Sequence, residues 1–374
     1  MWRARVRTGK ARGGRARGRA LVPLALVAAI WAAAALAPAC GGGEDDAPPG
    51  TGGPPRPVMM GFSTLPRELN AESYGAAIAF AGKHGEVLLV QRTVPWEDFR
   101  PGAVVSDALA ETTAAEIEAI EDTGDALFFA IDPTDGATGR DRLGALPADM
   151  AGRRFDDEEV RAAFASYAEY IARNYTPEYL ALGVEMNLYY ERNEGDFEEY
   201  KSLYNAVYAR VKEISPETQV TVTFQYEDLQ GILPREDAHF ASWHLLRAFE
   251  PNIDFIGLST YPSLVFAHPA QIPEEYYTQV TAFTRKPVAF TEMGYATAQD
   301  GGNEEQAAFV ERALRDAEDL EMPFAIWFAI WDPAYARDTP YAAFQSIGLR
   351  RADDAEKPGW QVWERARARA YAGG

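Results

Sequence analysis

Short apolar runs alternate with amphipathic stretches along residues 58–374. Eight of these runs have the length and the β-branched and aromatic content of strands: 58–63, 86–92, 125–132, 179–185, 219–227, 253–261, 287–292 and 324–331. Helical patterns lie between them, for example at 116–120, 157–173, 197–214 and 304–320, and a last helix is expected at 358–370. Strands that alternate with helices pair in parallel, so the pattern predicts an α/β fold, a single-domain (β/α)8 TIM barrel.

An open, doubly wound sheet is the alternative arrangement of the same elements. In its nucleotide-binding form, that fold carries a glycine-rich loop directly after the first strand. Thr64-Leu65-Pro66-Arg67 follows the first predicted strand here, and no such loop is present. The sequence therefore favours the closed barrel.

The strand ends are where a barrel of this kind places its chemistry. Because side chains alternate between the two faces of a strand, the inward face can be deduced from the apolar pattern. We expect four strands to direct one face inward: Ala181, Gly183 and Glu185 in the fourth, Phe255, Gly257, Ser259 and Tyr261 in the sixth, Val288, Phe290 and Glu292 in the seventh, and Ala325, Trp327, Ala329 and Trp331 in the eighth. Each inward face then ends on a polar or aromatic residue.

Glu185 and Glu292 are thus predicted to face one barrel mouth from the fourth and seventh strands. Two carboxylates in a shared cleft are what glycoside hydrolysis requires, since one protonates the leaving oxygen and the other attacks the anomeric carbon or activates water. The alternative is that each is a strand-end acid in a local ion pair, because the chain has 56 acidic residues. Two inward acids in apolar strands favour catalysis.

The sequence around these acids resembles the clan A retaining glycoside hydrolases, most of all their endo-β-mannanase and endo-β-galactanase branches. Gly183-Val184-Glu185-Met186-Asn187 is similar to the acid/base motif, and Phe290-Thr291-Glu292-Met293-Gly294-Tyr295 to the nucleophile motif. Supporting segments follow in the same order along the chain: 254–261, 327–331, 348–349 and 357–360. The resemblance implies a double displacement with Glu292 as the ionised nucleophile and Glu185 as the acid and then the base.

One position departs from the clan pattern. Much of the clan carries asparagine before the acid/base, where it contacts the sugar 2-hydroxyl, but this chain has Val184 there. A substrate contact must then come from elsewhere, and we expect it from Asn187, Gln225 or Glu227. Glu227 has the alternative of being an ordinary acid at a helix start.

Further residues are expected around the two acids. Tyr261 is expected to hydrogen-bond Glu292 and orient it, and Arg92 either does the same electrostatically or is a surface arginine in an ion pair. Trp331 is the expected sugar-stacking platform, with Trp327 one layer deeper. The remaining candidates for substrate contacts are Tyr295, Trp96 and Asp132.

Composition narrows the partners. The chain has 36 Lys+Arg against 56 Asp+Glu in 374 residues, a formal net charge of −20, so a polyanion such as nucleic acid is not an expected ligand. The single cysteine excludes a disulfide scaffold, and the four histidines (His84, His239, His244 and His268) lack metal-ligand spacing. We expect a carbohydrate substrate, no metal, no cofactor and a monomer.

The first 57 residues are predicted to be an export signal and a linker. A basic run up to Arg19 precedes the apolar stretch 20–39, as in secretory signals, although about 20 apolar residues would also just span a bilayer. Leu36-Ala37-Pro38-Ala39-Cys40 resembles the bacterial lipobox, with Pro38 as a departure. That resemblance implies a signal peptide over 1–39 and a lipid on Cys40.

Residues 40–57 are rich in glycine, proline and acids and are expected to be a flexible tether for the domain at 58–374. Gly41 is not the aspartate associated with inner-membrane retention, so an exported lipoprotein of the outer membrane is expected.

The expected function is that of a retaining hydrolase of β-linked glycans. Two alternatives stay open: a non-catalytic glycan-binding barrel and a solute-binding lipoprotein. The sequence leaves the sugar, the linkage and endo or exo action open.

Overall fold

The computed structural model describes residues 53–235, 239–298 and 302–373. The predicted signal, Cys40 and the linker up to residue 52 lie outside these described residues. The strands are β1 (Met59–Ser63), β2 (Val87–Thr93), β3 (Ala126–Asp132), β4 (Tyr179–Ala181), β5 (Gln219–Thr221), β6 (Thr223–Gln225), β7 (Ile256–Thr260), β8 (Val288–Met293) and β9 (Phe324–Trp327).

The strands form one closed parallel sheet. Their order is β5-β4-β3-β2-β1-β9-β8-β7-β6, and every pair in it is parallel. β5 and β6 belong to one chain segment interrupted only at Val222, with β5 paired to β4 and β6 to β7. The two ends of the order therefore join, which confirms the predicted barrel with its fifth strand split in two.

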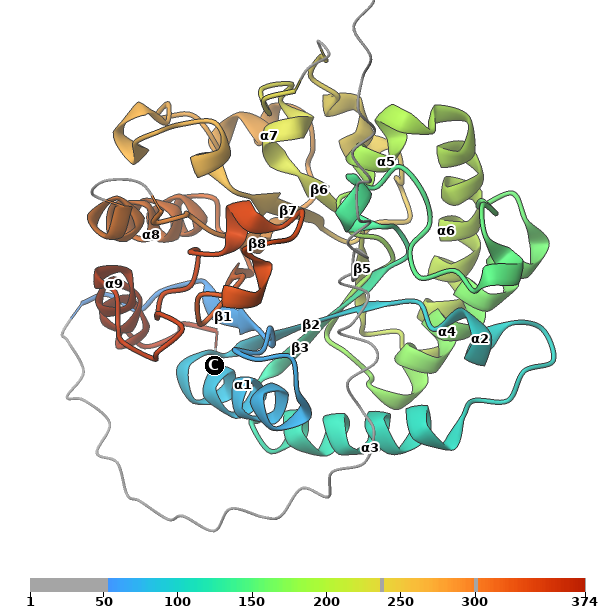
Figure 1. The fold of residues 1–374 in the computed structure, drawn as a ribbon. Coiled ribbons are helices and arrows are strands. Elements are labelled where there is room, and N and C mark those ends of the chain that lie inside the picture. Colours follow the sequence, from blue (N-terminus) through green and yellow to red (C-terminus); the bar gives the residue numbers. More distant parts are fainter. Residues whose placement is uncertain (1–52, 236–238, 299–301, 374) are drawn as a thin grey trace, which may run out of the picture.

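Helices surround the strands as a ring (Figure 1). They are α1 (Ala71–His84), α2 (Trp96–Phe99), α3 (Asp107–Glu121), α4 (Glu158–Asn174), α5 (Met186–Arg192), α6 (Glu194–Ile214), α7 (Tyr226–Leu229), α8 (Gly302–Asp319) and α9 (Pro358–Arg367). The five predicted helical segments correspond to α3, α4, α6, α8 and α9. The regular alternation with helices fails after β6 and β7, where the described chain forms only α7 and short 3-10 turns. Between β7 and β8 the prolines at 262, 269, 273 and 287 account for this, because proline lacks the amide hydrogen that helices need.

Side-chain caps define where the main helices begin. Asn70 accepts a hydrogen bond from the Ser73 amide at 2.8 Å before α1. Asp157 accepts from the amides of Glu159 and Val160 before α4. These caps satisfy donors that the first turn of a helix leaves unpaired, and each stabilises its helix by about 1 kcal/mol.

Apolar side chains form two layers, one inside the barrel and one between the strands and the helices. The inner layer consists of Val87, Leu89, Phe128, Ala130, Ala181, Val184, Phe255, Ala289, Phe324 and Ile326. The outer layer is larger and contains the other faces of the same strands, such as Leu88, Leu258 and Phe290. The barrel is therefore filled with side chains below its mouth, as expected for eight strands.

The predicted inward faces are right for the sixth predicted strand and wrong for the last, and in the fourth and seventh strands they are wrong at Gly183, Val288 and Phe290. In β9, Phe324 and Ile326 belong to the inner layer, whereas Ala325 and Trp327 belong to the outer layer. The alternation of Trp327, Ala329 and Trp331 suggested the opposite face. Aromatic side chains fit both layers, so their spacing alone did not distinguish inside from outside.

Two irregularities bring the glutamates into the mouth. β4 ends at Ala181, after which Gly183 faces Tyr200 on α6 while Val184 packs inside the barrel. In β8 the pairing with β7 shifts by one residue between Phe290 and Glu292, so Glu292 faces inward although Phe290 faces outward. An extra residue of this kind re-aims the side chains that follow it.

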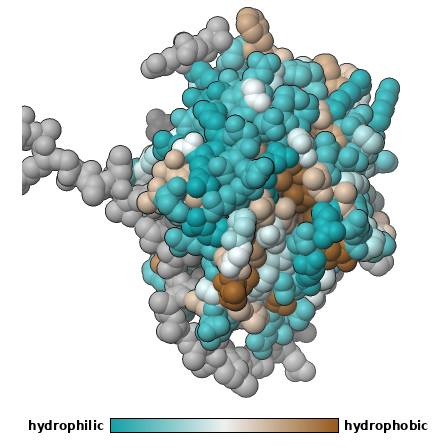
Figure 2. Space-filling model, turned by 90° about the vertical axis from the view of Figure 1, so that its right-hand side faces the viewer, coloured by the Kyte–Doolittle hydropathy of each residue, from teal (hydrophilic) through white to brown (hydrophobic). Residues whose placement is uncertain are grey.

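The face of the molecule that carries α2, α4 and α6 is mostly hydrophilic, with separate small apolar spots (Figure 2). No helix in the described part of the chain combines the length and apolar character needed to cross a bilayer.

Candidate active site

A cavity of about 180 Å³ lies at the C-terminal ends of the strands. Its polar wall comes from strand ends and one loop, and its apolar wall comes mainly from the long segment between β9 and α9. The lining residues are Leu65, Gln91, Asp132, Arg140, Glu185, Tyr261, Glu292, Phe328, Pro333, Tyr335, Ala336, Tyr341 and Phe344. The two glutamates predicted to meet do line one cavity.

Glu292 extends from β8 and is 6% exposed. Its Oε2 accepts a 2.6 Å hydrogen bond from the hydroxyl of Tyr261, the contact expected from the sequence. Burial is the largest influence on its pKa and the negative charge of Glu185 the next, and together they raise the pKa of Glu292 to about 8. The carboxylate of Glu185 is thus close enough to influence the pKa of Glu292.

Glu185 sits at the turn from β4 into α5. Its backbone has φ +50° and ψ +46°, a left-handed conformation that non-glycine residues rarely adopt. Its amide donates to Thr223 Oγ1 at 2.9 Å, and its Oε2 accepts from Arg140 Nε at 2.9 Å. Unusual backbone at a functional side chain is a common way to aim it.

Arg140 connects Glu185 to the end of β3. Its Nη1 donates to both oxygens of Asp132, at 2.7 and 2.9 Å, and to Thr134 Oγ1 at 2.9 Å. The side chains are nearly buried, so this cluster is shielded from solvent. Asp132 was expected at the site, whereas Arg140 was missed. The sequence feature that could have indicated Arg140 is its position in the loop after the third predicted strand, since loops at strand ends often carry functional residues.

The aromatic side chains of the cavity differ from those expected. Phe328, Tyr335, Tyr341 and Phe344 form the apolar wall. All of them lie in or beside the 30-residue stretch between β9 and α9, which holds only two short 3-10 turns, Ala334–Ala336 and Ala342–Phe344. A connection of that length without regular structure is itself an indication of a functional loop.

Asn187, Gln225 and Glu227 lie behind the cavity wall instead of lining it. Glu227 is fully buried and accepts four hydrogen bonds, from Thr260 Oγ1, Tyr276 hydroxyl, Gln225 Nε2 and the Tyr261 amide. Asn187 bridges the backbone of Gln225 and the carboxylate of Asp228. Their polar groups are used within the protein because β6 turns into α7 directly after Gln225.

Arg92 and Trp96 also lie away from the cavity. Arg92 faces the helix layer, where it forms an ion pair with the buried Glu116 and lies 4.9 Å from the Tyr74 ring. Of the two predicted roles of Arg92, the ion pair with an acid is the one observed. The pair is buried, whereas a surface pair was expected. Trp96 is 1% exposed and donates to the carbonyl oxygen of Gly144 at 2.8 Å.

Trp327, Trp331 and Tyr295 pack in the outer layer. Trp327 Nε1 donates to the carbonyl of Ile347 at 2.9 Å, and Trp331 Nε1 donates to Asp354 at 2.6 Å. Tyr295 is fully buried, and its ring lies 5.2 Å from that of Phe309 on α8. The structure therefore does not bring these predicted sugar platforms to the cavity. For the tryptophans the reason is that β9 presents the face opposite to the predicted one, whereas Tyr295 follows β8 and packs against α8.

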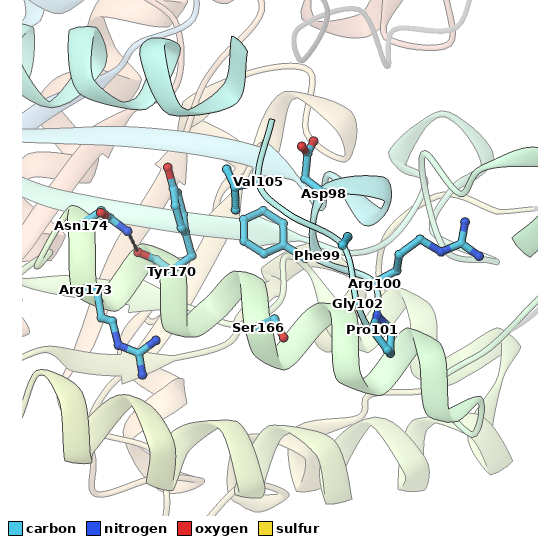
Figure 3. Close-up of a pocket in the computed structure, with 11 residues that line it drawn as sticks. Asp98, Phe99, Arg100, Pro101, Gly102, Val105, Ser166, Tyr170, Arg173 and Asn174 are labelled. Carbon is cyan, nitrogen blue, oxygen red and sulfur yellow. Dashed lines mark hydrogen bonds between the residues drawn. The ribbon is translucent and has the colours of Figure 1, made fainter. Parts of the chain in front are cut away.

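A wider groove of about 310 Å³ lies on the flank of the barrel, between α4 and residues 98–105 (Figure 3). Tyr170, Arg173 and Asn174 line it from α4, and Asp98 is its only acid. Asp98 accepts from the Ser106 amide at 2.8 Å. With one carboxylate already bonded to backbone, this groove lacks the paired acids of the barrel mouth.

The histidines occupy structural positions. Glu191, Asp228 and His239 direct one ligand atom each to within 4.8 Å of one another, but Arg235 pairs with both carboxylates and compensates their charge. His268 hydrogen-bonds Glu305 at 3.1 Å, and His244 packs on the ring of Tyr190. The guanidinium group of Arg235 therefore supplies the positive charge that a metal ion would otherwise supply to this cluster.

Comparison with solved structures identifies the barrel as one shared with glycoside hydrolases. The exo-β-1,4-mannosidase Op5Man5 of Opitutaceae bacterium strain TAV5 superposes with TM-score 0.61 at 16% identity, over 84% of this chain and 60% of the mannosidase. A GH5_18 protein of Streptomyces cattleya in complex with Manβ1-4GlcNAc gives 0.62 at 18% identity, over 84% and 79% of the two chains. Xylanase 10B of Thermotoga petrophila RKU-1, in complex with xylobiose, gives a TM-score of 0.59 at 11% identity, over 83% of this chain and 93% of the xylanase.

The present chain thus spans about 60% of the length of the mannosidase. No family model and no curated protein sequence matches this chain. At these identities the likeness concerns the fold, and the activity has to be argued from the cavity itself.

Proposed function

We propose that the protein is a retaining glycoside hydrolase that cleaves β-linked glycans. The observation that carries this proposal is the pair Glu185 and Glu292, which line one buried cavity at the mouth of the barrel. Similarity of the barrel to enzymes named as mannosidase and xylanase supports the substrate class. The cavity offers hydroxyl-binding groups on one wall and aromatic faces on the other, a combination suited to a sugar ring.

The proposed reaction has two displacements. First, a carboxylate oxygen of Glu292 forms a bond with the anomeric carbon, the glycosidic carbon–oxygen bond breaks, and Glu185 gives its proton to the leaving oxygen. Then Glu185 takes a proton from water, the water oxygen bonds to the anomeric carbon, and Glu292 is released. Tyr261 holds Glu292 in position through its 2.6 Å hydrogen bond.

The two acids share one proton in this mechanism. The pKa of Glu292 is raised to about 8 by burial and by the charge of Glu185, so its ionisation becomes easier once Glu185 carries the proton. Glu185 can receive it when the sugar enters and its ion pair with Arg140 at 2.9 Å loosens. Arg140 is therefore proposed as the residue that positions the acid between the two steps.

Hydrolysis of aryl β-glycosides and β-linked oligosaccharides tests the proposal. We expect the first product to keep the anomeric configuration of the substrate, as followed by proton NMR. A 2-deoxy-2-fluoro glycoside should label Glu292, as located by mass spectrometry of peptides. Inverted product, or a label on another residue, would contradict the proposed roles.

A non-catalytic glycan-binding barrel is the second candidate. Two observations favour it: Val184 occupies the position of the usual asparagine, and Arg140 forms an ion pair with the proposed acid. Sugar binding without turnover on a broad glycoside panel would support this candidate. A solute-binding protein of two lobes is not supported, since the described residues form one closed barrel.

The attachment to a membrane is a separate proposal. The lipobox-like segment before Cys40 supports an exported lipoprotein with the barrel tethered at the outer membrane. Radiolabelled palmitate should be incorporated into the full chain in a bacterial host and not into Cys40→Ala. Equal labelling of both proteins would contradict lipid attachment at this residue.

A further inference from the structure

We propose that the cavity accepts a single sugar at the non-reducing end of a chain, so that the enzyme is exo-acting. This inference rests on the proposed function and adds to it the position of cleavage. It is drawn from the segment 333–344, here called the mouth strap, and from the polar groups opposite it.

The mouth strap runs across one side of the barrel opening. It leaves β9 and, in Figure 1, its short turns lie over the opening beside β8 and β1. The hydroxyl of Tyr335 donates to the carbonyl of Pro66, in the loop after β1, at 3.0 Å. Tyr341 reaches the loop after β3, where a Cβ added to Gly136 would lie 2.7 Å from its hydroxyl. The strap therefore spans the sides of β1, β2 and β3.

The two ends of the strap are fixed to the barrel. Lys357, which is 2% exposed, donates to Asp332 at 2.6 Å and to the carbonyl of Ser346 at 3.0 Å. Gln306 on α8 donates to the carbonyl oxygens of Ile347 and Gly348 at 3.2 and 3.1 Å. Buried hydrogen bonds of this kind make the strap a fixed wall, since opening it would leave polar groups unpaired.

The space that remains suits one sugar ring. The cavity measures about 180 Å³. That volume is below the ~300–1,000 Å³ of sites that enclose larger ligands. An internal segment of a polysaccharide needs room on both sides of the cleaved bond, and the strap blocks one of them.

The strap and Glu185 lie on different sides of the cavity. The described residues between β5 and β7 contribute none of the lining side chains, so we infer that the leaving group extends over that side. Glu185 comes from β4, on this side, where it would meet the leaving oxygen. The sugar in the cavity would then lie between Glu292 and the strap, with the leaving group directed outward.

Gln91 is the group that would recognise the terminal sugar. Its Nε2 lies 3.4 Å from Asp132 Oδ2, whereas its Oε1 is buried and has no hydrogen-bond partner among the described residues. A buried acceptor without a donor is costly, and because the Gln91 side chain lines the cavity, rotation of its amide on sugar binding would let a sugar hydroxyl satisfy it. Gln91 is therefore a specificity-determining residue on the wall beside the strap.

Oligosaccharides of three to six β-linked sugars, labelled at the reducing end, test the position of cleavage. We expect free monosaccharide to be the first product and the labelled chain to shorten by one sugar at a time. Early products of two or more unlabelled sugars would overturn the exo proposal while the hydrolase proposal stands. No turnover on any β-glycoside would overturn both.

Two variants, each with a matched control, sharpen this test. Tyr341→Ala should open the strap side and allow release of disaccharides, whereas Tyr170→Ala, in the flank groove, should leave the product pattern unchanged.

Gln91→Ala should lower kcat/KM about tenfold, as expected for one lost hydrogen bond, and Gln219→Ala at the exposed start of β5 should not. Substrates that lack one hydroxyl group test whether Gln91 recognises the sugar. With the native protein, the substrate without the recognised hydroxyl should have a kcat/KM about tenfold lower than the full substrate. With Gln91→Ala, the same substrate should show no further loss of kcat/KM. Equal additional loss for every deoxy substrate would show that Gln91 only supports the fold.

Discussion

Glu227 and Glu292 are two buried glutamates that share one neighbour and differ in how their oxygens are used. Tyr261 donates its amide to Glu227 and its hydroxyl to Glu292. Glu227 accepts four hydrogen bonds and lies outside the cavity, whereas the carboxylate of Glu292 accepts one among the described residues and faces the cavity. Burial raises the pKa of both. Burial alone therefore does not single out a candidate acid, and it is the unused acceptors beside a cavity that make Glu292 the candidate.

The largest expected effect is on turnover. Glu292→Ala and Glu185→Ala should each lower kcat about 10⁴-fold, because each removes a group that forms or breaks a bond. Circular dichroism should show that both variants keep the native fold, so that the loss of turnover is not a loss of structure. Azide should restore part of the activity of Glu185→Ala, as measured by release of an aryl leaving group. Retained activity in either variant would remove the basis of the mechanism.

Glu227→Gln should show the opposite behaviour. The amide cannot accept all four donors, so we expect the free energy of unfolding to fall by about 3 kcal/mol. Denaturant unfolding measures this loss, with Glu217→Gln at the surface as the matched control. A stable variant with strongly reduced turnover would show instead that Glu227 acts in the reaction.

The pH dependence of stability tests the raised pKa of Glu292. The pKa of Glu292 is raised from 4.5 to about 8, so between these values the folded protein binds more protons than the unfolded chain. Stability contributed by the protonated group is then present below pH 4.5 and is lost as pH rises through 8. Glu292→Gln should therefore melt roughly 3–5 °C above the native protein at pH 9 and nearly equal to it at pH 4. A constant difference across this range would contradict the raised pKa.

Tyr261→Phe should have the smallest effect on turnover and should leave stability unchanged. It removes the hydrogen bond that lowers the pKa of Glu292 and leaves the amide contact to Glu227 intact. We expect kcat to fall about tenfold and the limb of the pH–rate profile that reports Glu292 to move to higher pH. Circular dichroism and thermal unfolding should match the native protein. An unchanged pH profile would show that the hydroxyl does not influence Glu292.

The sequence predicted the parts of this molecule that depend on local pattern. Periodicity identified the strands and the main helices, and the alternation of the two predicted the closed barrel, which the structure confirms. It also predicted that Glu185 and Glu292 face one mouth and that Tyr261 approaches Glu292. For Tyr261 this follows from the regular alternation along β7, whereas Glu185 and Glu292 reach the mouth through the left-handed backbone after β4 and the register shift in β8.

Tertiary structure decided which side chains surround the two acids. Trp327 and Trp331 lie in the outer layer because β9 presents Phe324 and Ile326 inward, and an aromatic pattern fits either layer. Arg140, Tyr335 and Tyr341 reach the cavity from loops whose paths are set by contacts with distant segments, such as Tyr335 with Pro66. Strand periodicity carries no information about such paths, since a loop takes its shape from the surfaces on which it packs.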